Sequence, residues 1–282
     1  MEYEENQQAV EKYECLIFDI DDTLYSAWSG FSHQITENIQ EYMIEKLGIE
    51  KSKVIELCAF LYKHYGTTMA GLRAIGYKFD YDDFHSFVHG RLPYDANLKL
   101  DPVLRNLLHS LPVRKIAFTN ADKNHANRVL SKLVLEDCFE QIICFETLNN
   151  TNKGNEPGND DENGVFDINE YCAAPNAGIK LPRTPVVCKP FEAAFEQAFK
   201  IAGINPQRTM FFDDSIRNIQ TGKRLGLTTV WVGSSRRTDG VDYALESIHN
   251  IKEALPELWE SNEKSEGVKY AEKVAIETSV KA

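Results

Sequence analysis

The chain has 282 residues, of which 43% are hydrophobic and 26% charged, as in ordinary globular proteins. Asp and Glu number 43 against 31 Lys and Arg, so the formal net charge is −12. This balance argues against a general nucleic-acid binder, which needs cationic surface to displace counterions. It is compatible with a small anionic substrate, because a bound divalent cation can reverse the field inside one pocket.

The N-terminal segment and the cysteines predict the cellular setting. Residues 1–14 are acidic and polar and lack the basic and apolar regions of a signal peptide. No apolar stretch approaches the ~20 residues needed to span a bilayer. The six cysteines form no CxxC pair and several lie in apolar runs, which favours buried free thiols in a reducing compartment. We therefore expect a cytoplasmic location, with the nucleus as the alternative.

The first predicted elements are a buried strand and a long helical segment. Residues 14–19 form an apolar run without alternation, which is typical of a strand buried on both faces. From about residue 27 to 100, apolar residues recur at helical spacing, as in KSKVIELCAFLYKHYG and DYDDFHSFVHGRL, and no strand pattern of any length occurs. We therefore expect an all-helical insertion after the first strand.

Strands and helices alternate over the following part of the chain. Asp101 and Pro102 predict the N-cap and first turn of a helix. Strands are expected in RKIAFTN, EQIICFE, RTMFFDD and, as the last one, LTTVWVG. Helices are expected over residues 123–134, in PFEAAFEQAFKIAG up to Gly203, and in SIRNIQTGKRLG up to Gly226. This order predicts an α/β fold, a Rossmann-like parallel sheet with helices on both faces.

The predicted elements divide the chain into a discontinuous core, an insertion and two irregular segments. The core is expected to comprise residues 14–26 and 101–260, and the helical insertion residues 27–100. Residues 147–183 are rich in Asn, Gly, Pro and acid, which predicts a long mobile loop. Residues 261–282 mix Lys and Glu with few large apolar groups, which predicts a disordered tail.

The first predicted strand ends in a cluster of acids. Asp19, Asp21 and Asp22 lie within four residues, so their carboxylates repel one another and need a cation or neutralisation. Alternate residues of an extended chain point the same way, so Asp19 and Asp21 can share one site. A capping turn, in which Asp and Thr also gather, is the alternative explanation.

Three further apolar runs end in polar groups that suit a phosphate site. Thr119 and Asn120 can donate to a phosphate oxygen, and Lys189 can neutralise its charge. Asp213 and Asp214 offer the carboxylate oxygens that Mg²⁺ prefers. Helix capping or an ordinary solvated lysine explains each run taken alone. Because ligands bind at the carboxyl ends of parallel strands, we expect all four ends to converge.

The joint pattern resembles the haloacid-dehalogenase-like (HAD) hydrolase superfamily. That superfamily has DxDx[TV], a hydrophobic strand ending in Thr or Ser, a Lys, and then paired acids; here the motifs are DIDDT, IAFTN, VCKP and FFDDS, within residues 14–240. The helical insertion is similar to the superfamily's C1-type cap, which closes over the site and favours small substrates. The resemblance implies a Mg²⁺-dependent phosphomonoester hydrolase.

The resemblance also implies roles for the residues that carry the reaction. Asp19 would attack phosphorus and become an aspartyl phosphate. Asp21 would protonate the leaving alcohol and then activate the hydrolytic water, and its presence favours phosphoryl transfer over dehalogenation. Thr119, Asn120 and Lys189 would hold the transferred phosphoryl group.

The metal site follows from the same resemblance. Mg²⁺ would be bound by Asp19, by the backbone carbonyl of Asp21 and by Asp214, and Asp213 would orient the metal waters. Asn218 stands where the superfamily commonly has a further acid.

Several strings are similar to the pyrimidine 5'-nucleotidase group within the superfamily. They include FDIDDTLY, YGTTMAGL, HGRLPYD and FTNADKNHA, and they imply hydrolysis of UMP or CMP; the Asn- and Gly-rich insertion departs from that group's compact pattern. Candidate substrate contacts are Tyr65, Thr67, Thr68, Arg91 and Tyr94, because a ring can stack on a base and a hydroxyl can read its edge. The alternative interpretation of Tyr65 and Tyr94 is that they pack between cap helices and do not contact the substrate.

A histidine pair on the predicted cap has a second interpretation. His85 and His89 are four residues apart on a predicted helix, a spacing that can bind metal. No HExxH motif surrounds them, so surface or packing histidines are the favoured interpretation.

Other functions remain open at this stage. The expected partner is a small phosphorylated metabolite, with no nucleic-acid polymer or membrane. A sugar phosphate or flavin mononucleotide is the alternative substrate, a phosphomutase shares the same intermediate, and a binding or regulatory protein would keep the fold with little turnover. A receiver domain is excluded, because it is about half as long and carries no second acidic pair after the lysine.

Overall fold

A six-stranded parallel sheet forms the centre of the structure, a computed structural model that describes residues 12–149, 166, 168, 180–236 and 238–259. The strand order is β3-β2-β1-β4-β5-β6, and every neighbouring pair is parallel. The strands are β1 (Cys15–Phe18), β2 (Arg114–Phe118), β3 (Gln141–Ile143), β4 (Thr209–Asp213), β5 (Thr228–Val232) and β6 (Tyr243–Leu245). The predicted α/β fold class is therefore confirmed.

The sheet has one strand more than the sequence predicted. LTTVWVG was expected to be the last strand, but β6 follows it at the edge of the sheet. This strand has three residues, too few to show any periodic pattern, and it forms because it pairs with β5.

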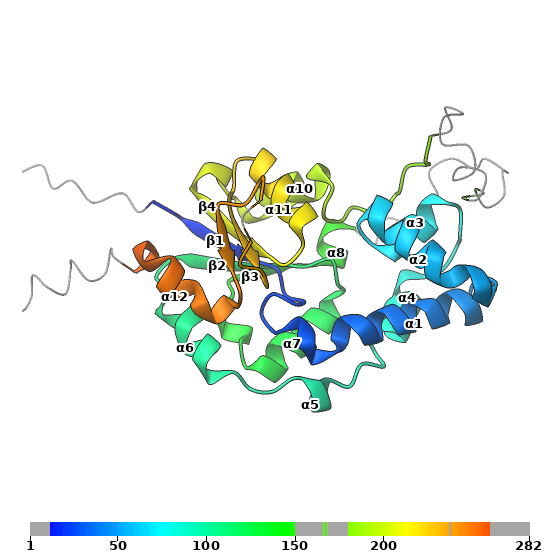
Figure 1. Ribbon diagram of the computed structural model, residues 1–282, viewed down its shortest axis with the longest axis horizontal. Coiled ribbons are helices and arrows are strands. Elements are labelled where there is room, and N and C mark those ends of the chain that lie inside the picture. Colours follow the sequence, from blue (N-terminus) through cyan, green and yellow to red (C-terminus); the bar gives the residue numbers. More distant parts are fainter. Residues whose placement is uncertain (1–11, 150–165, 167, 169–179, 237, 260–282) are drawn as a thin grey trace, which may run out of the picture.

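Helices cover both faces of the sheet (Figure 1). The side chains of β1 alternate between the two faces. Leu16 and Phe18 pack with α6, α7 and α12 on one face, whereas Cys15 and Ile17 pack with α10 and α11 on the other. These helices are α6 (Pro102–Ser110), α7 (Lys123–Leu133), α10 (Glu192–Ala202), α11 (Ile216–Arg224) and α12 (Ile251–Ala254). Burial on both faces explains why the strands lack alternation.

Local signals set where the core helices begin and end. The Asp101 carboxylate accepts a hydrogen bond from the backbone N–H of Leu104 at 2.9 Å, and Pro102 occupies the first turn of α6. Gly203, with φ of 61°, ends α10 in the left-handed conformation that glycine adopts without strain. These predicted boundaries are confirmed. Short 3₁₀ turns lie at Ala27–Ser29, Glu136–Cys138, Pro206–Arg208, Ile248–Asn250 and Pro256–Leu258.

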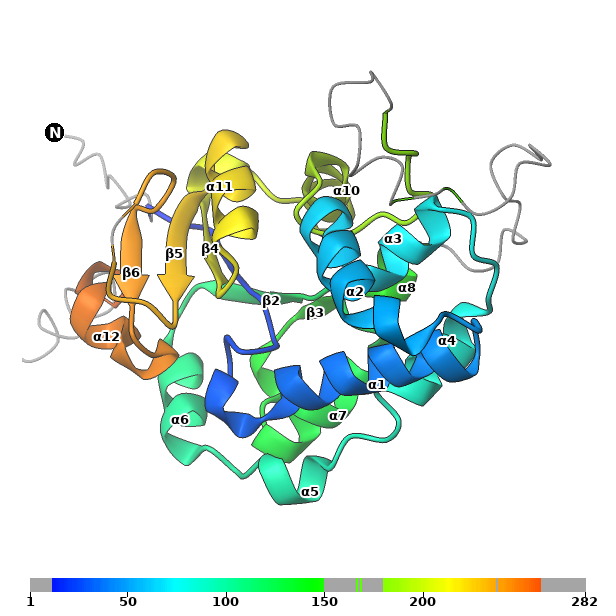
Figure 2. The same cartoon turned by 45° about the vertical axis from the view of Figure 1, so that its right-hand side comes forward.

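The segment between β1 and β2 is helical and has its own apolar cluster (Figure 2). Residues 27–100, all of which the structure describes, contain no strand. The helices are α1 (Phe31–Glu45), α2 (Lys51–Tyr65), α3 (Thr68–Ala74), α4 (Tyr81–Val88) and α5 (Tyr94–Asn97). Helices α1 to α4 lie together to one side of the sheet (Figures 1 and 2).

The helical segment also contacts the rest of the chain. Phe145, in α8 (Phe145–Leu148), packs into the apolar cluster of helices α1 to α4. The Arg217 guanidinium of α11 donates to the carbonyl oxygens of Tyr62 and Lys63, at 3.0 and 2.9 Å. These contacts hold the helical segment over the strand ends.

Some expectations concern residues outside the described part of the chain. The predicted tail, 261–282, and most of the predicted loop lie there. All five cysteines within the described residues are free and buried, as predicted, and Cys172 lies outside them. No helix within the described residues is long and apolar enough to cross a membrane.

Candidate active site

The polar residues predicted at four chain segments converge at one edge of the sheet. Asp19 directly follows β1, Thr119 follows β2, and Asp213 is the last residue of β4. Because β2, β1 and β4 are neighbours in register, their ends lie side by side. Lys189 comes from the segment before α10, which is not a strand, and its side chain reaches the same place.

Lys189 supplies the positive charge that the carboxylates Asp19 and Asp213 share. Its ammonium donates three hydrogen bonds, each of 2.7 Å, to Asp19 Oδ1, Asp213 Oδ2 and the carbonyl oxygen of Phe118. Only 1% of its surface is exposed. Burial lowers the pKa of the ammonium, but the two carboxylates outweigh burial and raise it, so the lysine stays charged.

Asp213 is held in a fixed orientation. Its Oδ1 accepts hydrogen bonds from the Ser215 backbone N–H and from the Asn218 amide, both at 2.9 Å, and Asn218 also donates to Oδ2 at 3.1 Å. Asn218, which the sequence placed where a further acid was expected, therefore donates to both carboxylate oxygens of Asp213. A second acid at that position would repel Asp213.

A group of three carboxylates can hold a metal ion. One oxygen from each of Asp19, Asp213 and Asp214 lies within 4.8 Å of the others. Burial, and then the neighbouring charges, raise the pKa of Asp19 to about 8 and that of Asp214 to about 9 despite the opposing effect of Lys189. This donor set fits Mg²⁺, since hard carboxylate oxygens are its preferred ligands and a cation would offset the crowded charge.

Asp21 lines the same cleft and forms a hydrogen bond with a histidine. It accepts hydrogen bonds from His125 Nε2 at 2.7 Å and from the Tyr25 hydroxyl at 2.6 Å, and Thr119 Oγ1 lies at 3.4 Å. Burial alone would raise the pKa of Asp21, but the charge and hydrogen bond of His125, together with Tyr25, lower it. Burial lowers the pKa of His125, but the Asp21 carboxylate outweighs it and the net shift is upward.

The sequence analysis missed both partners of Asp21. Tyr25 lies at the end of FDIDDTLY and His125 within FTNADKNHA, so each was quoted without a role. Residues four apart are neighbours on a helix, but the backbone from Asp21 to Tyr25 is irregular, so the spacing does not predict their contact. The contact of His125 with Asp21 can be predicted only once β1 and β2 are known to be neighbours in the sheet.

Thr119 and Asn120 support the site through different contacts. The Thr119 hydroxyl accepts a hydrogen bond from the Ala121 backbone N–H at 3.0 Å. The Asn120 amide accepts from the backbone N–H of Lys189 at 2.8 Å and donates to its carbonyl oxygen at 3.0 Å. Asn120 therefore positions Lys189, and both Thr119 and Asn120 line the cleft above.

A cleft of about 580 Å³ lies between this edge of the sheet and the helical segment. From the core it is lined by Asp19, Asp21, Asp22, Thr119, Asn120, Lys189 and Asp214. From the helical segment it is lined mainly by apolar residues and hydroxyls of α1, α2 and α3, among them Ile35, Ile39, Ile55, Tyr62, Thr67, Thr68 and Met69. Its volume suits a small molecule with one charged end and one apolar end.

Two of the predicted substrate contacts line the cleft and three do not. Thr67 and Thr68 line it. Tyr65 is buried and donates to the Pro182 carbonyl oxygen at 3.0 Å, while Arg91 pairs with Glu41 at 2.8 Å on the surface. Tyr94 is buried as well and bonds His125. Burial in the fold accounts for the two tyrosines, and a surface ion pair accounts for Arg91.

Phe84 and Tyr62 both line the cleft beside the histidines; Phe84 is buried, whereas Tyr62 offers an accessible ring and was not selected from the sequence. It lies three residues before Tyr65 on α2, and its surface is 52% exposed. The helical period places the two tyrosines on nearby faces, so spacing alone does not separate them.

Comparison with known proteins agrees with this architecture. No family model matches the chain. Phosphate metabolism protein 8 of Saccharomyces cerevisiae is 25% identical over 218 residues, which are 74% of this chain and 58% of the yeast protein. The chain therefore spans less than two thirds of the length of that curated relative.

Two solved structures are similar over most of the chain. CbbY from Rhodobacter sphaeroides, in complex with phosphate, has a TM-score of 0.54 at 15% identity, covering 87% of this chain and 99% of CbbY. The HAD phosphatase from Thermococcus onnurineus has a TM-score of 0.51 at 15% identity, covering 85% of this chain and 96% of the phosphatase. At this level of identity the likeness concerns the fold. The chain thus has the α/β fold of HAD-like hydrolases.

Proposed function

We propose that this protein is a Mg²⁺-dependent hydrolase of small phosphomonoesters, with Asp19 as the nucleophile. One observation carries the proposal: Lys189 bonds Asp19 and Asp213 at 2.7 Å each, and Asp214 completes a carboxylate group that suits a divalent cation. A buried nucleophile beside fixed positive charge is what attack on a phosphate dianion requires. A purely structural role does not explain why three carboxylates gather within 4.8 Å of one another beside the cleft.

The reaction proceeds in two displacements. An Asp19 oxygen forms a bond to phosphorus while the bond from phosphorus to the alcohol oxygen breaks, and the alcohol leaves with a proton. Water then attacks the aspartyl phosphate, loses a proton to the same acid–base group, and releases inorganic phosphate with Asp19 restored. Asp19 and Asp214 would hold Mg²⁺, which would neutralise charge on the phosphoryl oxygens.

Asp21 and His125 form the acid–base group. Because the pKa of Asp21 is lowered and that of His125 raised, the pair holds its shared proton on His125 Nε2 in the resting site. The two atoms are 2.7 Å apart, so the proton can pass to Asp21 along the hydrogen bond when the leaving oxygen needs it. Tyr25 holds the carboxylate in place at 2.6 Å.

We further propose that residues 27–100 act as a cap over an α/β core of residues 14–26 and 101–260. The cleft lies between the two parts and has both polar and apolar walls. Closing such a cleft excludes water and strengthens the electrostatic interactions with the phosphoryl group. A cleft of about 580 Å³ has no room for a protein or a nucleic-acid duplex.

The substrate we propose is a pyrimidine nucleoside 5'-monophosphate. The half-exposed Tyr62 ring offers a stacking surface for a base, and Thr67 and Thr68 offer hydroxyls at the same wall. The yeast relative is named for phosphate metabolism, which is consistent with a phosphate-releasing activity. Sugar phosphates and flavin mononucleotide are the competing substrates, because an apolar wall also accommodates them.

Substrate choice is tested by phosphate release with Mg²⁺ from UMP, CMP, AMP, flavin mononucleotide and several sugar phosphates. We expect the highest kcat/KM for UMP or CMP. Tyr62→Leu is the matched variant: it should raise KM for UMP while leaving ribose 5-phosphate, which has no base, unchanged. Equal kcat/KM for all compounds, or a higher value for a sugar phosphate, would contradict the nucleotide substrate. The proposed aspartyl-phosphate mechanism would be unaffected.

A further inference from the structure

We propose that His85, His89 and Asp122 form a second metal site, which takes a transition-metal ion such as Zn²⁺. This inference is independent of the proposed phosphatase activity, because none of the three residues belongs to the Asp19, Asp213 and Asp214 group. One nitrogen or oxygen from each of the three lies within 4.8 Å of the others. All three are buried within the described fold.

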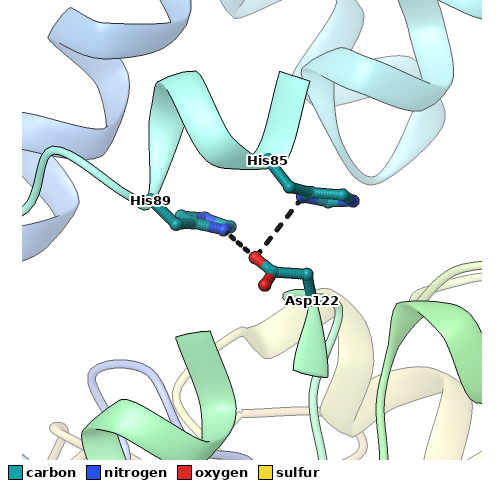
Figure 3. A group of neighbouring side chains, drawn as sticks. All are labelled: His85, His89 and Asp122. Carbon is teal, nitrogen blue, oxygen red and sulfur yellow. Dashed lines mark hydrogen bonds and ion pairs between the residues drawn. The ribbon is translucent and has the colours of Figure 1, made fainter. Parts of the chain in front are cut away.

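The three side chains converge from two parts of the structure (Figure 3). His85 and His89 project from the C-terminal turn of α4 toward Asp122, which is the N-cap of α7. The Nδ1 atoms of His89 and His85 lie 2.5 and 3.6 Å from the same carboxylate oxygen, Asp122 Oδ2. A four-residue spacing on one helix face is what two histidine ligands of one ion require.

The carboxylate is already oriented for binding. Asp122 Oδ1 accepts the backbone N–H of His125 at 3.0 Å as the cap of α7. This leaves Oδ2 facing the two imidazoles. A hydrogen bond that fixes a ligating carboxylate is a common supporting feature of metal sites.

His85 carries the second, independent observation. Neither of its ring nitrogens has a hydrogen-bond partner, although both are buried and the residue is only 7% exposed. Leaving a buried polar atom unpaired costs roughly 1–3 kcal/mol, so native structures rarely do so without a reason. An ion ligated by Nδ1 would give that nitrogen a partner, which the surrounding side chains do not supply.

The chemistry of the donors selects the kind of ion. Two imidazoles and one carboxylate suit Zn²⁺ and similar ions, whereas Mg²⁺ prefers oxygen ligands alone. Burial, followed by the charge of His89, lowers the pKa of His85 to about 4, so it is neutral at pH 7 and has a lone pair to give. Burial likewise lowers the pKa of His89.

An entry path and a plausible geometry are both present. A cavity of about 650 Å³ is lined by His85, His89 and Asp122, and the two histidines also line the active-site cleft. Zn²⁺ ligands at about 2.0–2.1 Å in a tetrahedron stand about 3.3 Å apart. The 3.6 Å between His85 Nδ1 and Asp122 Oδ2 is close to this value. The 2.5 Å between His89 Nδ1 and Asp122 Oδ2 would lengthen, because the ion replaces the proton that these two atoms share.

The site would join the cap to the core. His85 and His89 belong to the helical segment, and Asp122 begins a helix that packs on the sheet. An ion bound to all three restricts movement of α4 relative to α7. Occupancy would therefore hold the cleft in the arrangement seen in this structure.

The test uses the full chain without an affinity tag, stripped of metal and returned to excess Mg²⁺. Co²⁺ is titrated as a spectroscopic probe, because its visible absorption reports nitrogen ligands and low coordination number. We expect one Co²⁺ per chain, displaced by Zn²⁺, and a higher unfolding temperature in its presence.

Two variants separate metal binding from folding. Asp122→Asn keeps the helix cap, since Asn caps as well as Asp, but removes the anionic ligand. His85→Leu removes a ligand whose nitrogens make no hydrogen bond, so the metal-free variant should be as stable as the parent. Each should weaken Co²⁺ binding at least about tenfold.

Two control variants exclude the other candidate groups. His109→Ala alters a second group, His109, Asp137 and Cys138, whose aspartate is already paired with Arg105. Asp214→Asn alters the carboxylate group beside Lys189. Both should keep the Co²⁺ spectrum. No binding by the parent protein, or binding that survives both His85→Leu and Asp122→Asn, would overturn the proposal and leave a packing contact between cap and core.

Discussion

Lys189 is the residue on which the charge balance of the site depends. It neutralises two buried carboxylates at once and gives each of its three N–H groups to a different oxygen. Removing one member of a buried ionic group leaves the others uncompensated, which typically costs about 3–5 kcal/mol. The lysine therefore supports the folded state as well as the proposed phosphoryl transfer.

We expect Lys189→Met, which keeps an unbranched side chain one atom shorter and removes the charge, to lower the free energy of unfolding by about 3–5 kcal/mol. The measurement is urea denaturation in EDTA, where no metal compensates the carboxylates. A variant within about 1 kcal/mol of the parent would show that Asp19 and Asp213 do not depend on the ammonium.

At this scale the sequence predicted the identity of the polar residues better than their contacts. Asp19, Thr119, Lys189 and Asp214 were expected to meet, and all four line one cleft. Asp19 and Asp21 were also expected to share one site, and both line the same cleft. The bond from Asp21 to His125 was not expected, because β1 ends at Phe18 and strand alternation gives no partner for the irregular backbone that follows.

At the scale of structural elements, the end of α2 lies in close contact with the segment before α10, which carries Lys189. Gly66 ends α2 with φ of 82°, and a Cβ built on it would lie 2.3 Å from the Lys189 carbonyl oxygen and 2.6 Å from Pro190 Cδ. No side chain fits there. The helical segment can thus approach the lysine because this residue is glycine.

We expect Gly66→Ala to destabilise the protein more than Gly48→Ala and to reduce phosphate release, because the new methyl group displaces the Lys189 backbone. Gly48 is the matched control, since its φ is 67° but nothing lies within 4 Å of its Cβ position. A side chain at positive φ costs about 1–2 kcal/mol in the left-handed helical region, and Gly66, with ψ of −41°, lies outside that region, which adds to the difference between the two variants. Equal unfolding midpoints and equal activities for the two variants would contradict the close contact.

Element types were predictable wherever a pattern extended over several turns or a strand was buried on both faces. The helices after Asp101 and before Gly203 carry end signals, and the structure confirms them. Two short elements were missed: β6 forms by pairing with β5, and α8 begins within EQIICFE, all of which was predicted to be a strand. The segment before Lys189 reads as a strand by composition, but no strand of the sheet includes it.

For the whole molecule, the proposed metal requirement should appear as added stability. Asp19 and Asp214 have raised pKa values because burial and mutual repulsion disfavour their charges, and a cation would relieve both effects. An ion that binds only the folded state stabilises it by about 2.7 kcal/mol at a hundredfold excess over its Kd.

We therefore expect Mg²⁺ to raise the unfolding temperature of the parent protein and to have a much smaller effect on Asp214→Asn. Thermal unfolding with increasing Mg²⁺ measures this directly. Asp239→Asn, which removes the same charge from an exposed position, should respond like the parent. The same response in all three proteins would place the ion elsewhere.

The most direct test of the account compares phosphate release by the parent protein and Asp19→Asn with Mg²⁺ present, on the best substrate of the panel. We predict release by the parent, and at least about a thousandfold loss in the variant, because an amide cannot form the aspartyl phosphate. Folding of the variant is checked by its unfolding temperature. Release by folded Asp19→Asn at the parental rate would contradict the nucleophile and, with it, the proposed mechanism.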